Sequence, residues 1–195
     1  MSSLRERKRV RTRQALIDAA AELFERRGYD GTTIADIAAA ADVSTRTFFS
    51  YFASKEDVVF PDADARVQAA LIAIDERRPG ERPMELLLRG LAELGDAGDD
   101  LVGPMAALRL RFVRTVPSVR GRGLHRQLDA QTQIAGRLHA AFPDELDEVE
   151  AAALVGAFVG AIAGALEVLL RDEDDPYVVR ERLQRATAVA LRPWT

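Results

Sequence analysis

A short stretch of the chain carries side chains that can bind phosphate and read the edge of a nucleobase. The guanidinium of Arg46 has two parallel donors that match the O6 and N7 acceptors of guanine, and the ring edge of Phe49 can contact the methyl group of thymine. Ser44, Thr45 and Ser50 add hydroxyl groups close by. Residues of these types at this spacing indicate contact with DNA.

These side chains need a helix that turns them outward, and the surrounding sequence predicts one. Thr33-x-x-Asp36 and Ser44 are helix-start signals, as is Ser54-x-x-Asp57 for a third helix, because a hydroxyl at a helix start accepts hydrogen bonds from free backbone amides. Asp42 suits the turn between the first two helices, since aspartate tolerates the left-handed conformation. Two short helices joined in this way form a helix-turn-helix, whose second helix enters the major groove. The inward stripe of that second helix is predicted to be Thr47, Phe48, Tyr51 and Phe52.

Two residues of the motif have a second interpretation or a second role. Thr33, at the start of the first helix, offers backbone amides and a hydroxyl to a phosphate. Phe49 could instead pack on a neighbouring helix of its own chain, as most large apolar side chains do.

Three segments of this region together match a single sequence pattern at the correct spacing. They are Thr33-Ile34-x-x-Ile37-Ala38, Val43-Ser44 and Thr47-Phe48-Phe49-x-Tyr51-Phe52-x-Ser54-Lys55-Glu56. In that register the stretch from about Val10 to Phe60 resembles the DNA-binding domain of TetR-type bacterial regulators. Asp42 and Arg46 depart from the pattern, which commonly has glycine at both positions. The resemblance implies that Thr45, Tyr51 and Lys55 contact DNA, mostly at phosphates. The predicted DNA-binding residues are Thr33, Ser44, Thr45, Arg46, Thr47, Phe49, Ser50, Tyr51 and Lys55.

Composition favours an all-α protein. The 195 residues are 48% hydrophobic and 30% charged, and strand-forming runs are absent. The chain has no cysteine, which excludes disulfides and zinc–thiolate sites. The N-terminus is charged, and the longest uncharged apolar run, Ala151 to Leu166, is short for a bilayer. We therefore expect a cytoplasmic protein without a membrane partner.

Charge is distributed unevenly along the chain. The net charge is −4, yet residues 1–60 hold 10 basic and 9 acidic residues, so the acidic excess lies beyond residue 60. Leu4 to Arg13 is a basic arm, which is either a solvated tail or a contact to the minor groove or to phosphate. The positive end of the chain is thus the end that carries the motif.

Proline and glycine divide the chain into about nine predicted helices. A break is expected at Pro61, a second at Pro79–Pro83, and helix starts are expected at Pro117 and at Pro143–Asp144. The predicted domains are a three-helix DNA-binding domain over residues 1–56 and a helical ligand-binding and dimerisation domain over residues 57–195. Three small helices followed by six larger ones match the architecture that the resemblance implies.

A ridge of glycines predicts a close contact between helices. Gly156, Gly160 and Gly164 repeat every four residues, which lets a second helix approach closely. The resemblance implies that the last two helices of each subunit form the dimer interface, and the alternative is an internal core helix. The predicted interface residues are Gly156, Gly160, Gly164, Leu183, Ala186 and Val189.

The resemblance implies that the middle helices enclose a pocket for a small-molecule effector. The same apolar residues would also suit a core, and the arginines between Arg109 and Arg126 would also suit a solvated helix face. An anionic ligand is the alternative for some of these arginines. The predicted ligand-binding residues are Leu87, Leu91, Met105, Leu108, Arg109, Phe112, His125 and Leu128.

The motif and the resemblance together predict a ligand-responsive transcriptional repressor that binds a palindromic operator in double-stranded DNA as a homodimer. Its expected mechanism is a shift of the fourth helix, interrupted at Pro61, when the effector binds. The chain lacks a glycine-rich phosphate loop, a Gly-x-Ser-x-Gly elbow and a metal-binding histidine spacing, so no enzyme activity, cofactor or metal is expected. An architectural DNA-binding protein and a helical carrier or enzyme remain as alternatives.

Overall fold

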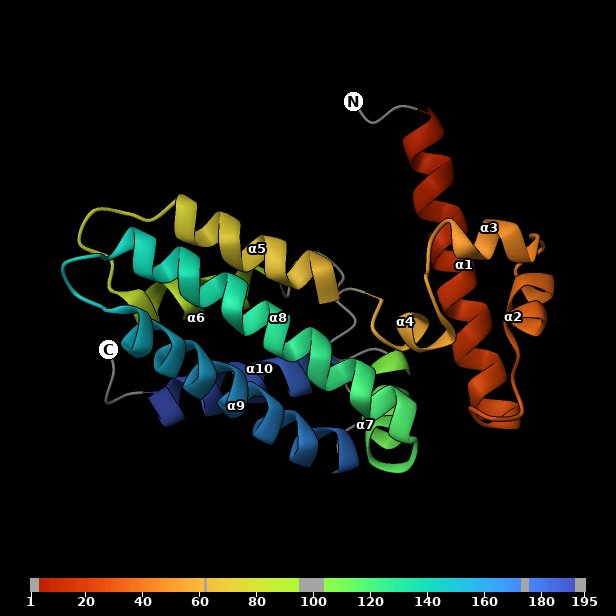
Figure 1. Cartoon of the computed structure of the whole chain (residues 1–195). Helices are drawn as coiled ribbons and strands as arrows, with labels where there is room; N and C mark the ends of the chain where they lie inside the picture. Colours follow the sequence, from red (N-terminus) through yellow and green to blue (C-terminus); the bar gives the residue numbers. More distant parts are fainter. Residues whose placement is uncertain (1–3, 62, 95–103, 173–175, 192–195) are drawn as a thin grey trace. The chain divides into compact units, whose positions relative to one another are not determined.

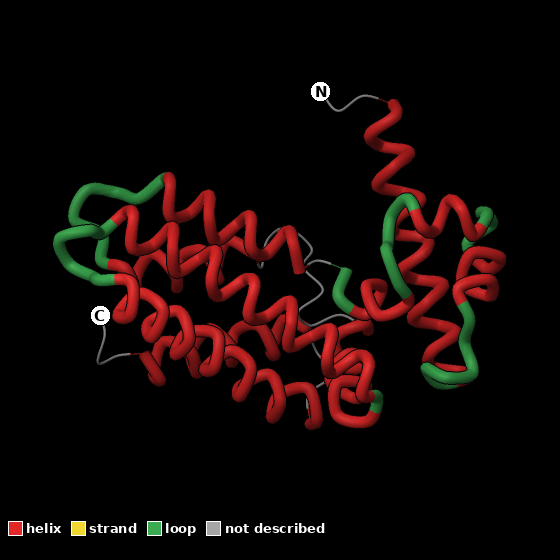
Figure 2. The backbone as a smooth tube through the Cα atoms, in the orientation of Figure 1, coloured by secondary structure: helices red, strands yellow, loops and turns green. Residues whose placement is uncertain are grey.

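The chain folds into α-helices, as the composition predicts. The structure is a computed structural model that describes residues 4–61, 63–94, 104–172 and 176–191. Within these ranges it contains ten helices joined by loops and turns, and no strand (Figures 1 and 2). The all-α prediction is confirmed, with one helix more than the nine expected.

The helices divide into two compact units, each of which has its own packing. The first unit contains α1 (Leu4–Arg27), α2 (Ile34–Ala40), α3 (Thr45–Phe49), α4 (Lys55–Val59) and α7 (Pro104–Thr115). It also includes the first turns of α8 (Pro117–Ala141), up to Gly123. The second unit contains the rest of α8 together with α5 (Ala63–Asp75), α6 (Pro83–Leu94), α9 (Glu148–Asp172) and α10 (Pro176–Leu191).

The first unit packs around the inner face of α1. Leu16, Ala20 and Phe24 recur at helical spacing on that face and are fully buried. Ile37 of α2 and Phe48 of α3 are also fully buried, so each short helix contributes at least one large anchor to this unit. The anchors are what hold α2 and α3, because helices of five to seven residues are not stable by themselves.

The basic arm is helical. α1 begins at Leu4 and therefore extends through the whole arm. Arginine is a good helix former, which accounts for the extension. Residues 4–11 are all exposed, so the positive charge of these turns faces solvent.

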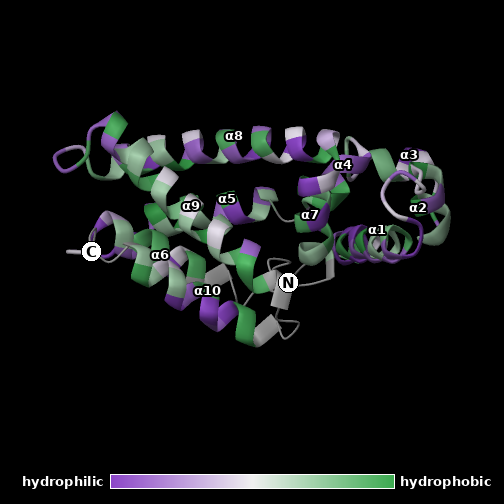
Figure 3. Cartoon of the chain, turned by 90° about the horizontal axis from the view of Figure 1, so that it is seen from below, coloured by the Kyte–Doolittle hydropathy of each residue, from purple (hydrophilic) through white to green (hydrophobic). Residues whose placement is uncertain are grey.

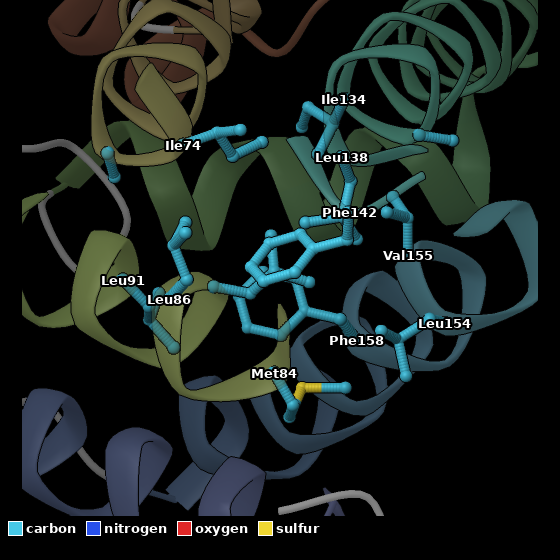
Figure 4. Packing of buried hydrophobic residues seen from close by; sticks show 13 residues of the cluster. Ile74, Met84, Leu86, Leu91, Ile134, Leu138, Phe142, Leu154, Val155 and Phe158 are labelled. Atoms are coloured by element: carbon cyan, nitrogen blue, oxygen red, sulfur yellow. The ribbon is translucent and has the colours of Figure 1, made fainter. Parts of the chain in front are cut away.

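The second unit has one large apolar cluster. Figure 4 shows the rings of Phe142 and Phe158 at its centre, surrounded by aliphatic side chains from α5, α6, α8 and α9. Met84, Leu86 and Leu138 within it are fully buried. On α8 these buried positions alternate with exposed ones, and Figure 3 shows hydrophobic and hydrophilic turns following one another along this helix.

The predicted helix breaks and starts are confirmed at three positions and shifted at a fourth. α8 begins at Pro117, as expected. α4 ends at Val59 and α5 begins at Ala63, which places the interruption at Pro61. The Pro79–Pro83 segment separates α5 from α6. The apolar helix α9, however, begins at Glu148 and not at Pro143–Asp144, because Asp147 and Glu150 exchange side-chain-to-amide bonds of 2.8 and 2.9 Å and form the start signal there.

α9 exposes small residues along one face. Ala153, Ala157, Gly160 and Gly164 are exposed, and Gly156 is half-buried. By length and composition alone, Glu148–Leu169 could cross a membrane, and it is the one helix among the described residues that passes this test. Core helices of soluble proteins pass the same test, so this finding is weak evidence for a span.

Candidate nucleic-acid interface

The caps that the sequence predicts for the motif are present. The Thr33 hydroxyl accepts from the amide of Asp36 at 3.1 Å, and the Asp36 carboxylate accepts from the amide of Thr33 at 2.9 Å. Bonds from the Thr33 side chain and backbone lower the pKa of Asp36, so the carboxylate stays charged in this role. Ser44 caps α3 by accepting from the amide of Thr47 at 3.1 Å. Together the two caps set where α2 and α3 begin.

The turn between these helices depends on Asp42. Its φ of 54° is left-handed, and it is the one residue other than glycine with positive φ in the described ranges. The Asp42 amide donates to the carbonyl of Ala39 at 3.1 Å and the Val43 amide to that of Ala38 at 2.9 Å, which closes the turn. Asp42 therefore keeps the left-handed conformation that glycine favours at such a turn.

On helix α3 and at its end, the residues that are predicted to contact base edges face outward. Thr45, Arg46, Phe49 and Ser50 are exposed, and Phe49 as a residue is 54% exposed. Among the ring contacts of the described residues, Phe49 meets only Phe48, in a T-shaped arrangement with 5.6 Å between the ring centroids. The alternative in which Phe49 is buried against its own chain is therefore not what the structure contains.

Other residues that are predicted to contact DNA also make contacts within the motif itself. Thr47 is half-buried, and its hydroxyl lies 2.9 Å from that of Ser44. Ser50 ends α3 and donates its hydroxyl to the carbonyl of Thr47 at 2.6 Å. Tyr51 is half-buried, whereas Phe52 behind it is buried and lies 5.7 Å from Phe48. These residues shape the motif as well as border its outer face.

Lys55 is engaged inside the first unit. Its ammonium donates to the carbonyl oxygens of Tyr29 and Thr32, each at 2.9 Å, and lies 3.9 Å from the centroid of the Tyr29 ring. The prediction of a phosphate contact did not include these bonds, since they join residues more than twenty positions apart.

Helix α4 is held to the start of α8 by an ion pair that the sequence did not indicate. Ser54 caps α4 as predicted, accepting from the amide of Asp57 at 3.3 Å. The buried carboxylate of Asp57 accepts two bonds from Arg122, at 2.8 and 3.2 Å. Phe60 lies so close to Gly123 that a Cβ there would be 2.9 Å from the ring. Nothing in the sequence indicates that Asp57 is buried or that Arg122 is its partner, so this pair is known only from the three-dimensional structure.

The predicted dimer residues differ in exposure. A Cβ added at Gly156, Gly160 or Gly164 would meet nothing within 4 Å, so this ridge is open in the single chain. On α10, Ala186 and Val189 are exposed. Leu183 is instead buried within its own chain, in a cluster with Leu169 and Val179, so we leave it out of the surface proposed below.

The predicted ligand residues are distributed over both units. Leu87 and Leu91 belong to the apolar cluster of the second unit. Met105, Leu108 and Phe112 are buried on α7 in the first unit, where Arg109 is half-buried. His125 and Leu128 are exposed, and His125 lies 3.4 Å from Asp129. A shared ligand site for these residues stays a prediction. In the described part of the chain, no group of three His, Asp or Glu side chains is arranged to hold a metal ion.

Comparisons with known proteins agree with this geometry. Residues 16–60 match the family model of bacterial regulatory proteins of the tetR family. Over 137 residues the chain is 40% identical to the HTH-type transcriptional regulator TcmR of Streptomyces glaucescens, which covers 69% of this chain and 60% of that protein. The match therefore spans less than two thirds of that relative's length.

Solved structures share the fold. FadR of Thermus thermophilus, a TetR-family transcriptional repressor in complex with lauroyl-CoA, has a TM-score of 0.55 at 23% identity, covering 92% of this chain and 93% of that one. A transcriptional regulator of Aquifex aeolicus has a TM-score of 0.54 at 21% identity, covering 91% and 98%. Residues 16–60 therefore form a helix-turn-helix of the tetR family of bacterial regulatory proteins, in a chain whose all-helical fold these solved structures share.

Proposed function

We propose that this protein is a cytoplasmic transcriptional regulator that binds a palindromic operator as a homodimer and represses transcription until a small molecule binds. The outward face of α3 is the observation that carries this proposal. Arg46 and Phe49 are exposed on a helix whose inner side is fixed by Phe48, so two side chains suited to base edges face away from the core. A helix that served only packing would not need them there.

Base contacts from one short helix are few, which is why we propose two copies. Specific recognition by helix-turn-helix proteins usually combines two half-sites related by a two-fold axis. The open glycine ridge of α9, extended by exposed Ala186 and Val189 of α10, is the surface that we assign to the second copy. Covering it with an identical chain would remove apolar area from water on both subunits at once.

The effector is proposed to bind within the helical part of the chain beyond the motif. The domain assignment of residues 1–56 to DNA and 57–195 to ligand and dimer contacts remains part of this proposal, although α7 and the first turns of α8 pack with the motif. For a ligand to move such a regulator from almost fully bound to almost fully released, it must favour one state by about 5.5 kcal/mol.

Arg46→Ala should relax the base preference at one position of each half-site. The guanidinium can donate to both O6 and N7 of a guanine, so its loss should cost roughly 1–3 kcal/mol for the preferred base and much less for the other three. Binding of the variant and of the wild type to a bound duplex and to all its single-base variants would measure this.

Arg46→Lys is the matched control, because it keeps the charge and loses the paired donors. It should restore part of the general affinity and not the base preference. If both variants lose affinity equally for every base at every position, Arg46 does not read a base, and α3 is not the specificity element.

A further inference from the structure

The first turns of α1 extend beyond the packed part of the first unit. Residues 4–11 are all exposed, and Thr12 and Arg13 are the first half-buried residues of this helix. At 1.5 Å per residue, the exposed turns are about 12 Å long. Figure 1 shows them continuing past α3 toward the N-terminus. This part of the basic arm therefore leaves its side chains open to a partner along its whole length.

One face of α1 changes from apolar to basic where the helix leaves the unit. The buried stripe of α1 begins at Leu16, and the same spacing of three or four residues continues backward through Arg13, Arg9 and Arg5. The guanidinium of Arg13 lies 5.2 Å from the centroid of the Phe52 ring, which follows the end of α3. Arg9 and Arg5 therefore continue the side of α1 that carries α3.

Two other arginines of the arm lie on the opposite side of the helix. Arg7 follows Arg5 by two positions, and Arg11 follows Arg9 by two positions. At about 100° per residue, two positions correspond to about 200° around the helix. The exposed turns thus carry one pair of arginines on the α3 side and a second pair, with the same spacing and charge, on the other side.

The charge of these turns suits an extended anionic partner. Residues 4–11 hold five basic residues against one acidic residue, Glu6. Arg5 with Arg9, and Arg7 with Arg11, are like charges four residues apart, an arrangement that destabilises an isolated helix. An array of negative charges beside the helix would offset this repulsion. Duplex DNA is such an array, with one phosphate charge for about every 1.7 Å of its axis.

The helical form of the arm indicates where it fits on DNA. An α-helix with its side chains is about 10–12 Å across, whereas the minor groove of B-DNA is about 6 Å wide. In this conformation residues 4–11 are too wide for the minor groove, and the major groove of the half-site is assigned to α3. The sugar–phosphate backbone beside α3 is the surface that remains for the arm.

A membrane surface is a poorer fit for these turns. Helices that lie on a membrane bury a continuous apolar face. Leu4 and Val10 are the two apolar residues of the exposed turns, and their positions are about 120° apart around the helix. Residues 4–11 therefore have no continuous apolar face, and the charge pattern favours DNA.

We infer that Arg5 and Arg9 bind phosphates of the DNA backbone beside the major groove that α3 enters. These contacts add affinity and do not read the sequence. The inference rests on the proposed function, because the arm is assigned to the same DNA as α3. Of the roles that the sequence left open for the arm, it selects the phosphate contact over the solvated tail and the minor groove.

The double variant Arg5→Gln/Arg9→Gln tests this inference against Arg7→Gln/Arg11→Gln. Each removes two positive charges, four residues apart, from the same exposed turns, and glutamine is about as good a helix former as arginine. The full-length chains would be titrated at several salt concentrations with a duplex selected from a random pool and with a random-sequence duplex. Circular dichroism would verify that all three chains are equally helical.

The two double variants should differ in their dependence on salt. For Arg5→Gln/Arg9→Gln, the slope of log affinity against log salt should be smaller than in the wild type by about 1.8, from two contacts of about 0.9 each. The loss should be the same on both duplexes, because phosphates carry no sequence information. Arg7→Gln/Arg11→Gln should lose less than half of this slope, and neither variant should change the base preference.

Several results would overturn the inference. Equal losses of slope in the two double variants would mean that the arm acts only through its overall charge. An unchanged slope in Arg5→Gln/Arg9→Gln would mean that these arginines do not bind phosphate. A changed base preference next to the half-site would mean that the arm reads bases. If this variant lost binding to vesicles that contain phosphatidylserine while its DNA affinity was unchanged, the arm would belong to a membrane surface.

A second measurement locates the phosphates. Replacing each backbone phosphate of the selected duplex in turn by an uncharged methylphosphonate should weaken binding of the wild-type chain at the contacted positions. At the phosphates that Arg5 and Arg9 bind, the same replacement should cost Arg5→Gln/Arg9→Gln little more, because the two changes remove one interaction. Fully additive losses at every phosphate would contradict the contacts.

Failure of the proposed function gives a different pattern. A wild-type chain that binds the selected and the random duplex with equal affinity overturns sequence-specific regulation, yet the slopes of the double variants on random duplex still test the arm. A wild-type chain that prefers the selected duplex, with equal slopes for all three chains, supports the regulator proposal and overturns the role of Arg5 and Arg9.

Discussion

Gly160→Leu is expected to separate the proposed dimer and to reduce operator affinity on the order of 100-fold, because the two half-sites would no longer be bound by one linked molecule. Gly160 is exposed on α9, and a Cβ there meets nothing within 4 Å in its own chain. A leucine side chain is therefore accommodated by the single subunit, and it obstructs only a second helix that approaches the ridge closely. Sedimentation and operator titration would measure the two effects.

Gly136→Leu is the matched control. Gly136 is also exposed on a long helix, α8, and an added Cβ there is equally free of contacts. Both substitutions should raise the helix propensity by roughly 0.5–1 kcal/mol, so neither should unfold the chain. If Gly160→Leu stays dimeric, or if Gly136→Leu dissociates in the same way, the glycine ridge is not the dimer surface.

Arg122→Met is expected to lower the free energy of unfolding by about 3 kcal/mol, since it leaves a buried carboxylate without its arginine. Asp57 is only 4% exposed as a side chain, and Arg122 bonds to both of its oxygens. Methionine keeps most of the apolar stem of the arginine, so the loss should report the charge and not the packing. Denaturant unfolding followed by circular dichroism would measure it.

Arg126→Met provides the comparison, because Arg126 forms an ion pair of the same length, 2.8 Å, with Asp64. Asp64 is 88% exposed, and water solvates its carboxylate after the arginine is lost. That substitution should cost less than about 1 kcal/mol. Equal losses for the two variants would show that burial of Asp57 does not determine the strength of its pair.

Local signals made the motif predictable. Hydroxyl residues at Thr33, Ser44 and Ser54 satisfy the same backbone amides in the structure that they were expected to satisfy, and Asp42 adopts the left-handed turn. Each of these features depends only on residues within about four positions of one another, so it can be predicted from the sequence. The exposure of Phe49 followed from the same register, since burying its neighbour Phe48 turns Phe49 away from the core.

Features that depend on distant residues were not predictable in this way. The bonds of Lys55 to the turn at Tyr29, and of Arg122 to Asp57, join positions far apart in the chain, and neither arginine nor lysine signals such a partner by its type. Leu183 shows the same limit: an apolar stripe on α10 does not reveal whether it faces its own chain or a second one, and here Leu183 packs on Leu169. The start of α9 shifted because Asp147 and Glu150 form a stronger start signal than Pro143.

The presentation of α3 in two copies is tested most directly by selecting duplexes from a random pool with the purified wild-type chain. Selected sequences should be palindromic, with half-site centres separated by about 10 base pairs or a multiple of it, so that two helices meet successive major grooves on one face of the DNA. A pool that converges on an unpaired site, or that shows no enriched sequence at all, would contradict recognition of base edges by two copies of this helix.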